Sequence, residues 1–145
     1  MSSHIIERRP TRDGATRLLE AAALPASDLT DAHMDDFFYC GSAAAPVGLV
    51  GLEFLGSDAL LRSLAVASDR RGSGLGSALV DEAEAHARAR GARSIFLLTT
   101  TAEQFFKSRG YLPAERATAP DAIRTSREFA DLCPASSAFL VKQLL

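Results

Sequence analysis

The first third of the chain changes from helical to extended spacing of its apolar residues. In residues 11–23 the apolar side chains recur at helical intervals and Pro25 closes the segment, which predicts a helix. Residues 27–37 mix polar and apolar side chains and include capping residues, so they predict a short helix or an ordered loop. The aromatic run at residues 37–42 (FFYCGS) is typical of a strand.

The middle of the chain shows the clearest extended pattern. Residues 47–66 (VGLVGLEFLGSDALLRSLAV) form two apolar runs joined by Gly-Ser-Asp, a turn sequence that supplies a residue with positive φ and an Asx contact. This arrangement predicts an antiparallel hairpin. From Leu75 apolar residues return at helical spacing, with acidic side chains early and basic side chains late, until Gly91 ends the predicted helix.

The last third of the chain alternates between strand and helix. Residues 94–100 (SIFLLTT) predict a buried strand, residues 102–110 a short helix capped by Gly110, and residues 136–144 (SSAFLVKQL) a final strand. We find no internal repeat and no low-complexity linker. The element order therefore predicts one α/β domain that spans residues 1–145, a length sufficient to bury a core without metal or disulfide.

Composition and charge remove several classes of function. The formal net charge is −2 and basic residues are scattered among acidic ones, which argues against a nucleic-acid partner. The two cysteines, Cys40 and Cys133, have no CxxC spacing, so neither a zinc site nor a disulfide framework is expected. No apolar run follows the charged N-terminus, and the longest apolar stretch, residues 43–52, is too short to span a membrane. We expect a cytoplasmic protein without a membrane partner.

Three alternating glycines, Gly72, Gly74 and Gly76, lie between the strand that ends near Val66 and the helix that begins near Leu75. The first amides of a helix lack partners and carry the positive end of the helix dipole, so glycines there form a cradle for phosphate. A Walker loop is excluded because Ser77-Ala78 follows Gly76 where Lys-Ser/Thr is required. A dinucleotide fingerprint fails because Ser77 replaces its third glycine and no acid follows about 20 residues on.

The stretch that fits, Arg71-Gly72-Ser73-Gly74-Leu75-Gly76, matches Arg/Gln-x-x-Gly-x-Gly/Ala, and here the sequence resembles the GNAT superfamily of N-acetyltransferases. The loop, the long helix, the strand SIFLLTT and the later FFKSRGY follow in that family's order, so the resemblance covers most of the chain. It implies a mixed, mostly antiparallel central sheet with splayed strands, flanked by helices. It also implies acetyl-CoA as acetyl donor, bound by Leu64, Ala65, Val66, Arg71, Gly72, Ser73, Gly74, Leu75, Gly76, Ser77, Thr99, Phe105 and Phe106.

For some of these positions a purely structural role is an alternative to the functional one. Arg71 is either a solvated surface charge or a cation that adds to anion binding at the helix terminus. Thr99 either caps the short helix that follows or lines the CoA channel. Phe105 and Phe106 serve the core, the pantetheine arm of CoA, or both.

Four segments carry a narrower resemblance: LLRSLAV, FLLTTTAEQFFKSRGY, AIRTSREF and DLCPASSAFLVK. Together they are similar to GNAT proteins from arsenic-resistance operons, which themselves resemble the acetyltransferase domain of glutamate N-acetylating enzymes. This resemblance implies a small, amino-acid-like acceptor whose amine is acetylated.

The usual catalytic side chains of the family are missing. Many members carry a tyrosine as general acid four residues before a Gly-aromatic pair, and here Phe106 holds that place before Gly110-Tyr111. A thiol pKa of about 8.5 lets the CoA thiolate leave with little protonation. Leu60 and Leu61 replace the family's base, so Glu53 is the candidate base through water, or else an exposed carboxylate at a strand end. Main-chain amides of residues 64–66 are candidates for stabilising the oxyanion.

Acceptor recognition has fewer signals. Arg62, in an apolar strand, is either a snorkelling edge residue or a ligand of a substrate carboxylate. Arg124 and Arg127 flank Thr125-Ser126; Arg124 is expected on a solvated helix face, whereas Arg127 stays open between that and carboxylate binding. Cys133 is expected to pack in the interior, because no histidine lies near it in the sequence.

These patterns predict an enzyme that transfers acetyl from acetyl-CoA to the amine of a small, carboxylate-bearing molecule, with a possible link to arsenic resistance. The missing tyrosine and base keep a second reading open, a non-enzymatic acyl-CoA sensor or regulatory module. A protein-lysine acetyltransferase is a third, although the arginines argue against an acidic groove for a basic peptide. A homodimer is compatible with this fold. No metal is expected.

Overall fold

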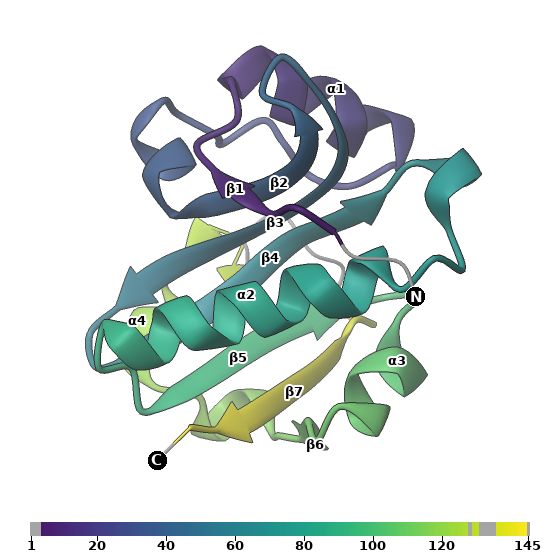
Figure 1. Ribbon diagram of the computed structural model, residues 1–145. Helices are drawn as coiled ribbons and strands as arrows, with labels where there is room; N and C mark the ends of the chain where they lie inside the picture. Colours follow the sequence, from purple (N-terminus) through teal and green to yellow (C-terminus); the bar gives the residue numbers. More distant parts are fainter. Residues whose placement is uncertain (1–3, 128, 131–135, 145) are drawn as a thin grey trace.

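Seven strands form a single mixed sheet in the computed structural model, which describes residues 4–127, 129–130 and 136–144 (Figure 1). The strand order is β1-β2-β3-β4-β5-β7-β6. Only β4 and β5 pair in parallel, and the other neighbours are antiparallel. This confirms the expected mixed, mostly antiparallel sheet.

The strands and helices follow one another in a fixed order along the chain. The strands are β1 (Glu7–Arg8), β2 (Phe37–Ser42), β3 (Ala45–Leu55), β4 (Asp58–Val66), β5 (Ser94–Thr99), β6 (Leu112–Pro113) and β7 (Ala138–Gln143). The helices are α1 (Arg12–Ala21), α2 (Leu75–Ala89), α3 (Glu103–Ser108) and α4 (Asp121–Arg124), with short 3₁₀ turns η1 (Ala32–Asp36), η2 (Ser68–Arg70) and η3 (Arg116–Thr118). The two-residue strands β1 and β6 are too short to leave a periodic pattern in the sequence.

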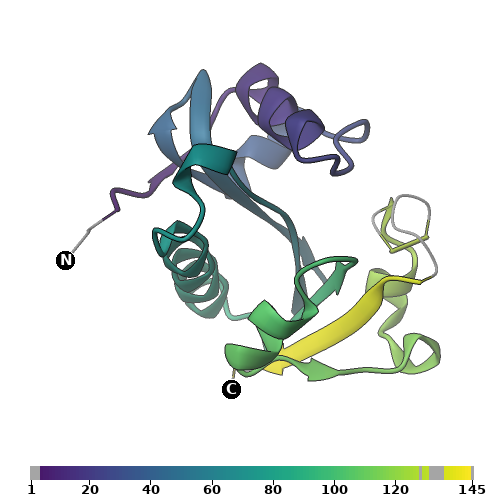
Figure 2. The same cartoon turned by 90° about the vertical axis from the view of Figure 1, so that its right-hand side faces the viewer.

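Helices α1 and α2 cover opposite faces of the sheet (Figure 2). The α2 face carries the larger core, in which Leu52 and Leu61 from the strands pack with Leu79 and Ala83 from the helix. On the other face, α1 packs on β3 and β4 through Leu19. A separate cluster under α4 includes Leu60, Phe96 and Ile123.

A side-chain cap at the N-terminus of α1 and a backbone turn at its C-terminus explain where the helix begins and ends. Thr11 is its N-cap, and its hydroxyl accepts a hydrogen bond from the amide of Gly14 at 3.0 Å. At the other end Ala23 adopts a positive φ of 57°, and the amide of Leu24 returns to the carbonyl of Leu19. The chain therefore leaves the helix two residues before the end that the pattern predicted.

The predicted hairpin is the centre of the sheet. β3 and β4 pair along most of their length, and the turn at Gly56 and Ser57 has the expected positive φ of 66° at the glycine. The ladder is interrupted between Leu49 and Gly51, where β4 has one extra residue, and Ser63 in this bulge takes a positive φ of 61°. A bulge in β4 redirects the strand beyond it.

β4 and β5 separate soon after they begin to pair. They are joined from Ala59 to Leu61 on β4 and from Ile95 to Leu97 on β5, and beyond these residues no pairing between them remains. β5 instead keeps a full antiparallel ladder with β7 on its other side. The splayed strands that the family resemblance implied are thus present, and the opening between them lies on the side where the glycine loop begins.

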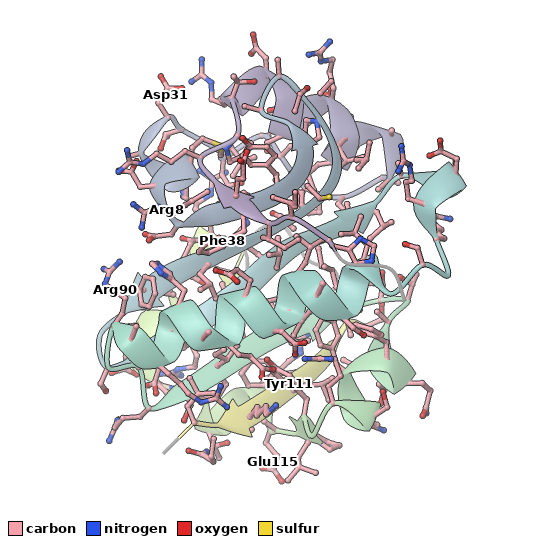
Figure 3. The ribbon with its side chains drawn as sticks, in the orientation of Figure 1. Arg8, Asp31, Phe38, Arg90, Tyr111 and Glu115 are labelled. Atoms are coloured by element: carbon pink, nitrogen blue, oxygen red, sulfur yellow. The ribbon has the colours of Figure 1, made fainter. Side chains whose placement is uncertain are left out.

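Buried polar contacts join α2 to the far part of the sheet. The hydroxyl of Tyr111 donates to Glu84 at 3.0 Å, and Nζ of Lys142 donates to the other oxygen of the same carboxylate at 3.0 Å. Tyr111 lies beneath α2 (Figure 3), fully buried, and burial beside the Glu84 charge raises the pKa of its phenol. Across the part of the chain that the structure describes, the helices are all too short or too polar to cross a membrane.

Candidate active site

The opening between β4 and β5 is a cavity of about 1070 Å³. Its walls come from β4, from the end of β5 and the turn after it, from α3, and from the segment that follows α1. The cavity lining includes residues 22–25, 62–66 and 99–102, together with Arg71, Phe105, Phe106 and Ser137. Because the strands diverge here, the backbone of β4 beyond the bulge faces a cavity instead of a neighbouring strand.

A smaller cavity of about 280 Å³ continues from this one to the start of α2. Val66, Arg71 and Phe105 line both cavities, and the glycines Gly72, Gly74 and Gly76 line the second. The two spaces form one path from the middle of the sheet to the N-terminus of a 15-residue helix.

The glycine loop fits a phosphate-bearing ligand. Gly72 and Gly74 have φ of 79° and 83°, where only glycine is free of strain, and a Cβ at either position would meet no atom within 4 Å. Packing therefore does not require glycine here, whereas the backbone conformation does. Gly74 is the N-cap of α2 and offers no side-chain cap, so the first amides of the helix stay available to an anion.

Two side chains of the loop differ in their roles. Arg71 is exposed, lines both cavities and donates from Nε to the carbonyl of Val66 at 3.4 Å. Its charge therefore lies on the path of a ligand. Ser73 contributes to neither cavity, since its hydroxyl donates to the carbonyl of Arg70 at 2.6 Å. The backbone of Ser73 belongs to the loop, but its side chain shapes the turn.

Thr99, Phe105 and Phe106, for which a structural and a cofactor-binding role were both considered, make structural contacts and also line the cavity. The Thr99 hydroxyl accepts from the amide of Ala102 at 2.9 Å, which orders the turn before α3, and Thr99 also lines the cavity. Phe106 is 3 % exposed, packs edge-on against Tyr111 and still borders the cavity. Phe105 approaches Gly76 from the cavity side.

Arg62 is not an edge residue with its charged group in solvent. Its side chain is fully buried and makes a bidentate pair with Asp28, Nη1 to Oδ2 at 2.6 Å and Nη2 to Oδ1 at 2.9 Å. Nη1 also donates to Oε2 of Glu53 at 3.0 Å, and Nε donates to the hydroxyl of Ser63 at 3.0 Å. The snorkelling reading is therefore wrong, because the strand turns this side chain inward.

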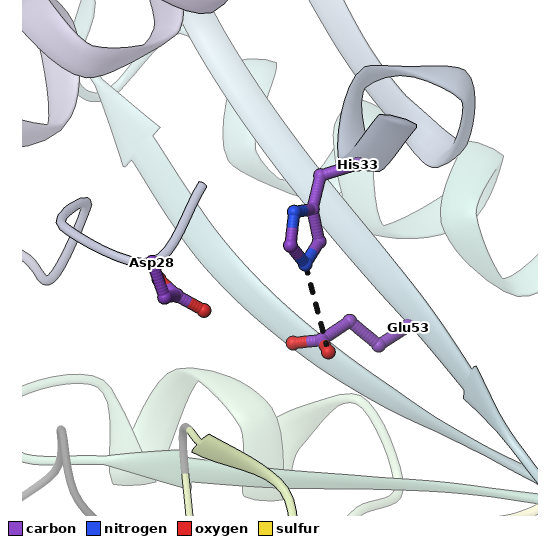
Figure 4. A group of neighbouring side chains, drawn as sticks. All are labelled: Asp28, His33 and Glu53. Carbon is purple, nitrogen blue, oxygen red and sulfur yellow. Dashed lines mark ion pairs between the residues drawn. The ribbon is translucent and has the colours of Figure 1, made fainter. Parts of the chain in front are cut away.

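Glu53 is likewise not an exposed carboxylate at a strand end. Its side chain is 17 % exposed and lies between Arg62 and His33, whose Nε2 is 3.8 Å from Oε1 (Figure 4). Glu53 does not line the cavity, whereas its partner Arg62 does. A base at Glu53 would therefore need a water molecule to reach the cavity, the route that the sequence hypothesis assigned to it.

Asp28, His33 and Glu53 bring three metal-ligating side chains within 4.8 Å of one another. Two observations make this group a poor metal centre. The amide of Thr30 donates to Nδ1 of His33 at 3.0 Å, which leaves the proton of the neutral ring on Nε2, the atom that faces Glu53. The guanidinium of Arg62 already supplies a cation to both carboxylates.

Ser137 is a residue that the sequence analysis did not single out. It is 6 % exposed, its Oγ has no hydrogen-bond partner among the described residues, and it lines the cavity just before β7. Its carbonyl accepts from Nη2 of Arg116 at 2.8 Å, so the backbone at this point is anchored. A serine at the start of a strand has no sequence signal for function, and only the fold shows its place.

The remaining residues of the acceptor hypothesis lie away from the cavity. Arg124 is exposed and pairs with Asp121 on α4, as expected for a solvated helix face. Arg127 is exposed and does not line the cavity. Cys133 lies outside the described residues. Asp28 and His33, by contrast, were missed by sequence reasoning because nothing in their local pattern separates them from other polar loop residues.

A splayed mixed sheet, a bulged fourth strand and a glycine loop at a helix N-terminus together define an α/β domain with an anion-binding helix terminus beside a cavity between diverging strands. The family model described as "Acetyltransferase (GNAT) family" matches residues 7–111. The chain belongs to the GNAT acetyltransferase family, as its sequence resemblance indicated.

Several relatives share part of the sequence. An amino-acid acetyltransferase from Azotobacter vinelandii is 40 % identical over 76 residues, which cover 48 % of this chain and 18 % of that protein. An uncharacterized N-acetyltransferase from Chlorobaculum tepidum is 35 % identical over 92 residues, 63 % of this chain and 59 % of that one. The chain thus spans less than two thirds of the length of these relatives, and less than a fifth of the amino-acid acetyltransferase.

The fold is shared with solved structures. N-acetylglutamate synthase from Neisseria gonorrhoeae, in complex with coenzyme A and N-acetyl-glutamate, superposes with a TM-score of 0.81 at 19 % identity. The match covers 100 % of this chain and 36 % of that one. At this identity the likeness concerns the fold.

Proposed function

We propose that this protein is an N-acetyltransferase that moves an acetyl group from acetyl-CoA to the amine of a small amino-acid-like acceptor. The observation that carries the proposal is the continuous path from the glycine cradle at α2 to the cavity between β4 and β5. An amino-acid acetyltransferase among the relatives, and a structural neighbour that contains coenzyme A and N-acetyl-glutamate, support this choice of donor and acceptor.

The donor end of the site is assigned to the loop. Amides of residues 72–77 bind the pyrophosphate of CoA, and Arg71 adds a cation beside it. Phe105 packs against the pantetheine arm, with Phe106 and Thr99 further into the cavity. Bound by these residues, acetyl-CoA would supply an activated thioester to the cavity between β4 and β5.

The chemistry then needs three groups of this chain. Those main-chain amides of residues 64–66 that point away from β3, toward the opening left by β5, stabilise the developing oxyanion. Glu53 removes a proton from the acceptor amine through water, since Arg62 lies between it and the cavity. With Phe106 at the place of the family's tyrosine, the hydroxyl of Ser137 donates a hydrogen bond to the departing thiolate.

The positive charge of Arg62 at the cavity is the basis for the proposed class of acceptor. Arg62 is the arginine of the sequence hypothesis that lines the cavity, so it is our candidate ligand for an acceptor carboxylate. Arg127 serves only acceptors long enough to extend beyond the cavity. A link to arsenic resistance rests on sequence resemblance alone, and arsenical amino-acid analogues therefore belong among the acceptors to be tried.

The experiment that tests the function is release of CoA thiol from acetyl-CoA by the purified protein. The panel of amines contains amino acids, arsenical analogues, polyamines and a lysine peptide. We expect release that depends on an amino acid. Binding of CoA without release across the panel would instead indicate a non-enzymatic sensor, and release with the peptide alone would indicate a protein-lysine acetyltransferase.

A further inference from the structure

The bidentate pair between Arg62 and Asp28 has the geometry by which an arginine binds a free carboxylate. Both oxygens of Asp28 accept from separate terminal nitrogens, at 2.6 and 2.9 Å. The side chains are 0 % and 4 % exposed. The protein itself therefore already fills the carboxylate position on the arginine that borders the acceptor cavity.

The remaining donors of Arg62 leave little room for a further ligand. Nε is used by Ser63 and Nη1 is shared with Glu53. An acceptor carboxylate can bind this guanidinium in two-point fashion only if it takes the place of Asp28. Such an exchange preserves the charge, because one carboxylate leaves and another enters.

Asp28 is placed so that this exchange is feasible. It lies on the segment between α1 and η1, which has no regular structure and whose first residues, Ala22–Pro25, form one wall of the cavity. Glu53 belongs to β3 and stays bound to the other side of Nη1. Rotation of one short side chain, without movement of the sheet, withdraws the Asp28 carboxylate from Nη1 and Nη2 of Arg62.

We propose that Asp28 is an intramolecular competitor for the acceptor's carboxylate, so that an α-amino acid binds by displacing Asp28 from Arg62. In an α-amino acid one carbon separates the amine from the carboxylate carbon. A carboxylate held on Arg62 therefore places the amine beside the guanidinium whose Nη1 binds Glu53, so that one bridging water can connect the amine to the Glu53 carboxylate. This inference rests on the proposed function and adds a specificity-determining residue to it.

The test compares Asp28→Asn with wild type, and Asp31→Asn serves as the matched control because its side chain is 86 % exposed, three residues away. KM is measured for each amino acid acetylated in the panel and for its uncharged amide, together with the Kd of acetyl-CoA. If the paired form dominates, removing the competitor lowers KM for the amino acid by about fivefold or more. The amide KM and the acetyl-CoA Kd stay unchanged, and Asp31→Asn changes none of these values.

An unchanged or higher KM for the amino acid in folded Asp28→Asn overturns the proposal. If that variant does not fold, NMR of ¹³C-carboxyl-labelled wild type decides. Addition of the amino acid in the presence of CoA must shift the Asp28 carboxyl, and an unshifted signal under saturation overturns the exchange. Acetylation of amines that lack a carboxylate, with no binding of amino acids, would overturn the exchange and leave acetyl transfer intact.

Discussion

Nη1 of Arg62 lies 3.0 Å from Oε2 of Glu53, a hydrogen bond that joins neighbouring strands at the border of the cavity between β4 and β5. The hydrogen bond fixes the position of the Glu53 carboxylate beside the guanidinium. If Glu53 is the base, this carboxylate accepts the proton that the acceptor amine loses. The other neighbour, His33, offers Nε2–H and cannot take the proton at Nδ1 without losing its bond from Thr30.

Glu53→Gln keeps an oxygen for Arg62 but removes the base. We expect kcat to fall by about 100-fold or more, the usual worth of a general base, with the Kd of acetyl-CoA unchanged. Steady-state kinetics and calorimetry measure the two quantities. Glu20→Gln, on the exposed side of α1, is the control and should behave as wild type. Full turnover by Glu53→Gln would remove Glu53 from the mechanism.

Gly74→Asp places a carboxylate at the N-terminus of α2, where the pyrophosphate of CoA is assigned. Like charges a few ångströms apart repel by roughly 1–4 kcal/mol, so the Kd for acetyl-CoA should rise by about tenfold or more. Gly56→Asp is a matched control, since Gly56 also has positive φ and open space around it but lies in the β3–β4 turn. Equal calorimetric affinities in the two variants would argue against the cradle.

Ser137→Ala separates a catalytic hydroxyl from a packing residue. Loss of a buried hydroxyl without a partner leaves stability unchanged or raises it slightly. If the hydroxyl serves the thiolate, kcat falls by about 10- to 100-fold while the midpoint of unfolding does not fall. Ser136→Ala, at the exposed neighbouring position, is the control. Wild-type kcat in Ser137→Ala would assign this serine to packing alone.

Acid should weaken the Arg62–Asp28 pair. Burial by itself raises the pKa of Asp28, but the hydrogen bonds and charge of Arg62 hold it below its ordinary value of 3.8. A carboxyl whose pKa is lower in the folded state stabilises the protein above its unfolded pKa, and this contribution disappears as pH falls through the folded pKa. Urea unfolding at pH 6 and pH 3 should therefore show a stability gap between wild type and Asp28→Asn that narrows in acid. A constant gap would contradict this linkage.

Tyr111→Phe tests the buried contacts under α2. Loss of a hydrogen bond to the Glu84 carboxylate should lower the free energy of unfolding by about 1–3 kcal/mol, because that oxygen loses its donor in a buried site. Tyr39→Phe, which removes a bond to Glu7 at the sheet edge, should cost less. Chemical denaturation measures the free energy of unfolding of both variants. Equal decreases would show that burial does not strengthen the contribution of the hydrogen bond to Glu84.

Local signals accounted for most of the fold. The hairpin centred on Gly56 and helix α2 with its C-terminal Gly91 were visible because their determinants lie within one element and its caps. The glycine loop was readable for the same reason, since φ values and free helix amides are properties of neighbouring residues. The end of α1 was displaced by Ala23, whose positive φ no propensity favours.

The sequence by itself determined the order of the longer strands and helices, the position of the glycine loop at residues 71–77 before α2, and the absence of the family's tyrosine at Phe106. Tertiary structure alone decided which polar side chains share the site. Asp28 and Arg62 are 34 residues apart, and they meet because the segment that follows α1 lies against the face of the sheet toward which the regular β3–β4 ladder directs Arg62. Ser137 reaches the cavity only because β5 leaves β4 and pairs with β7. Such contacts depend on packing between distant segments, which local spacing does not encode.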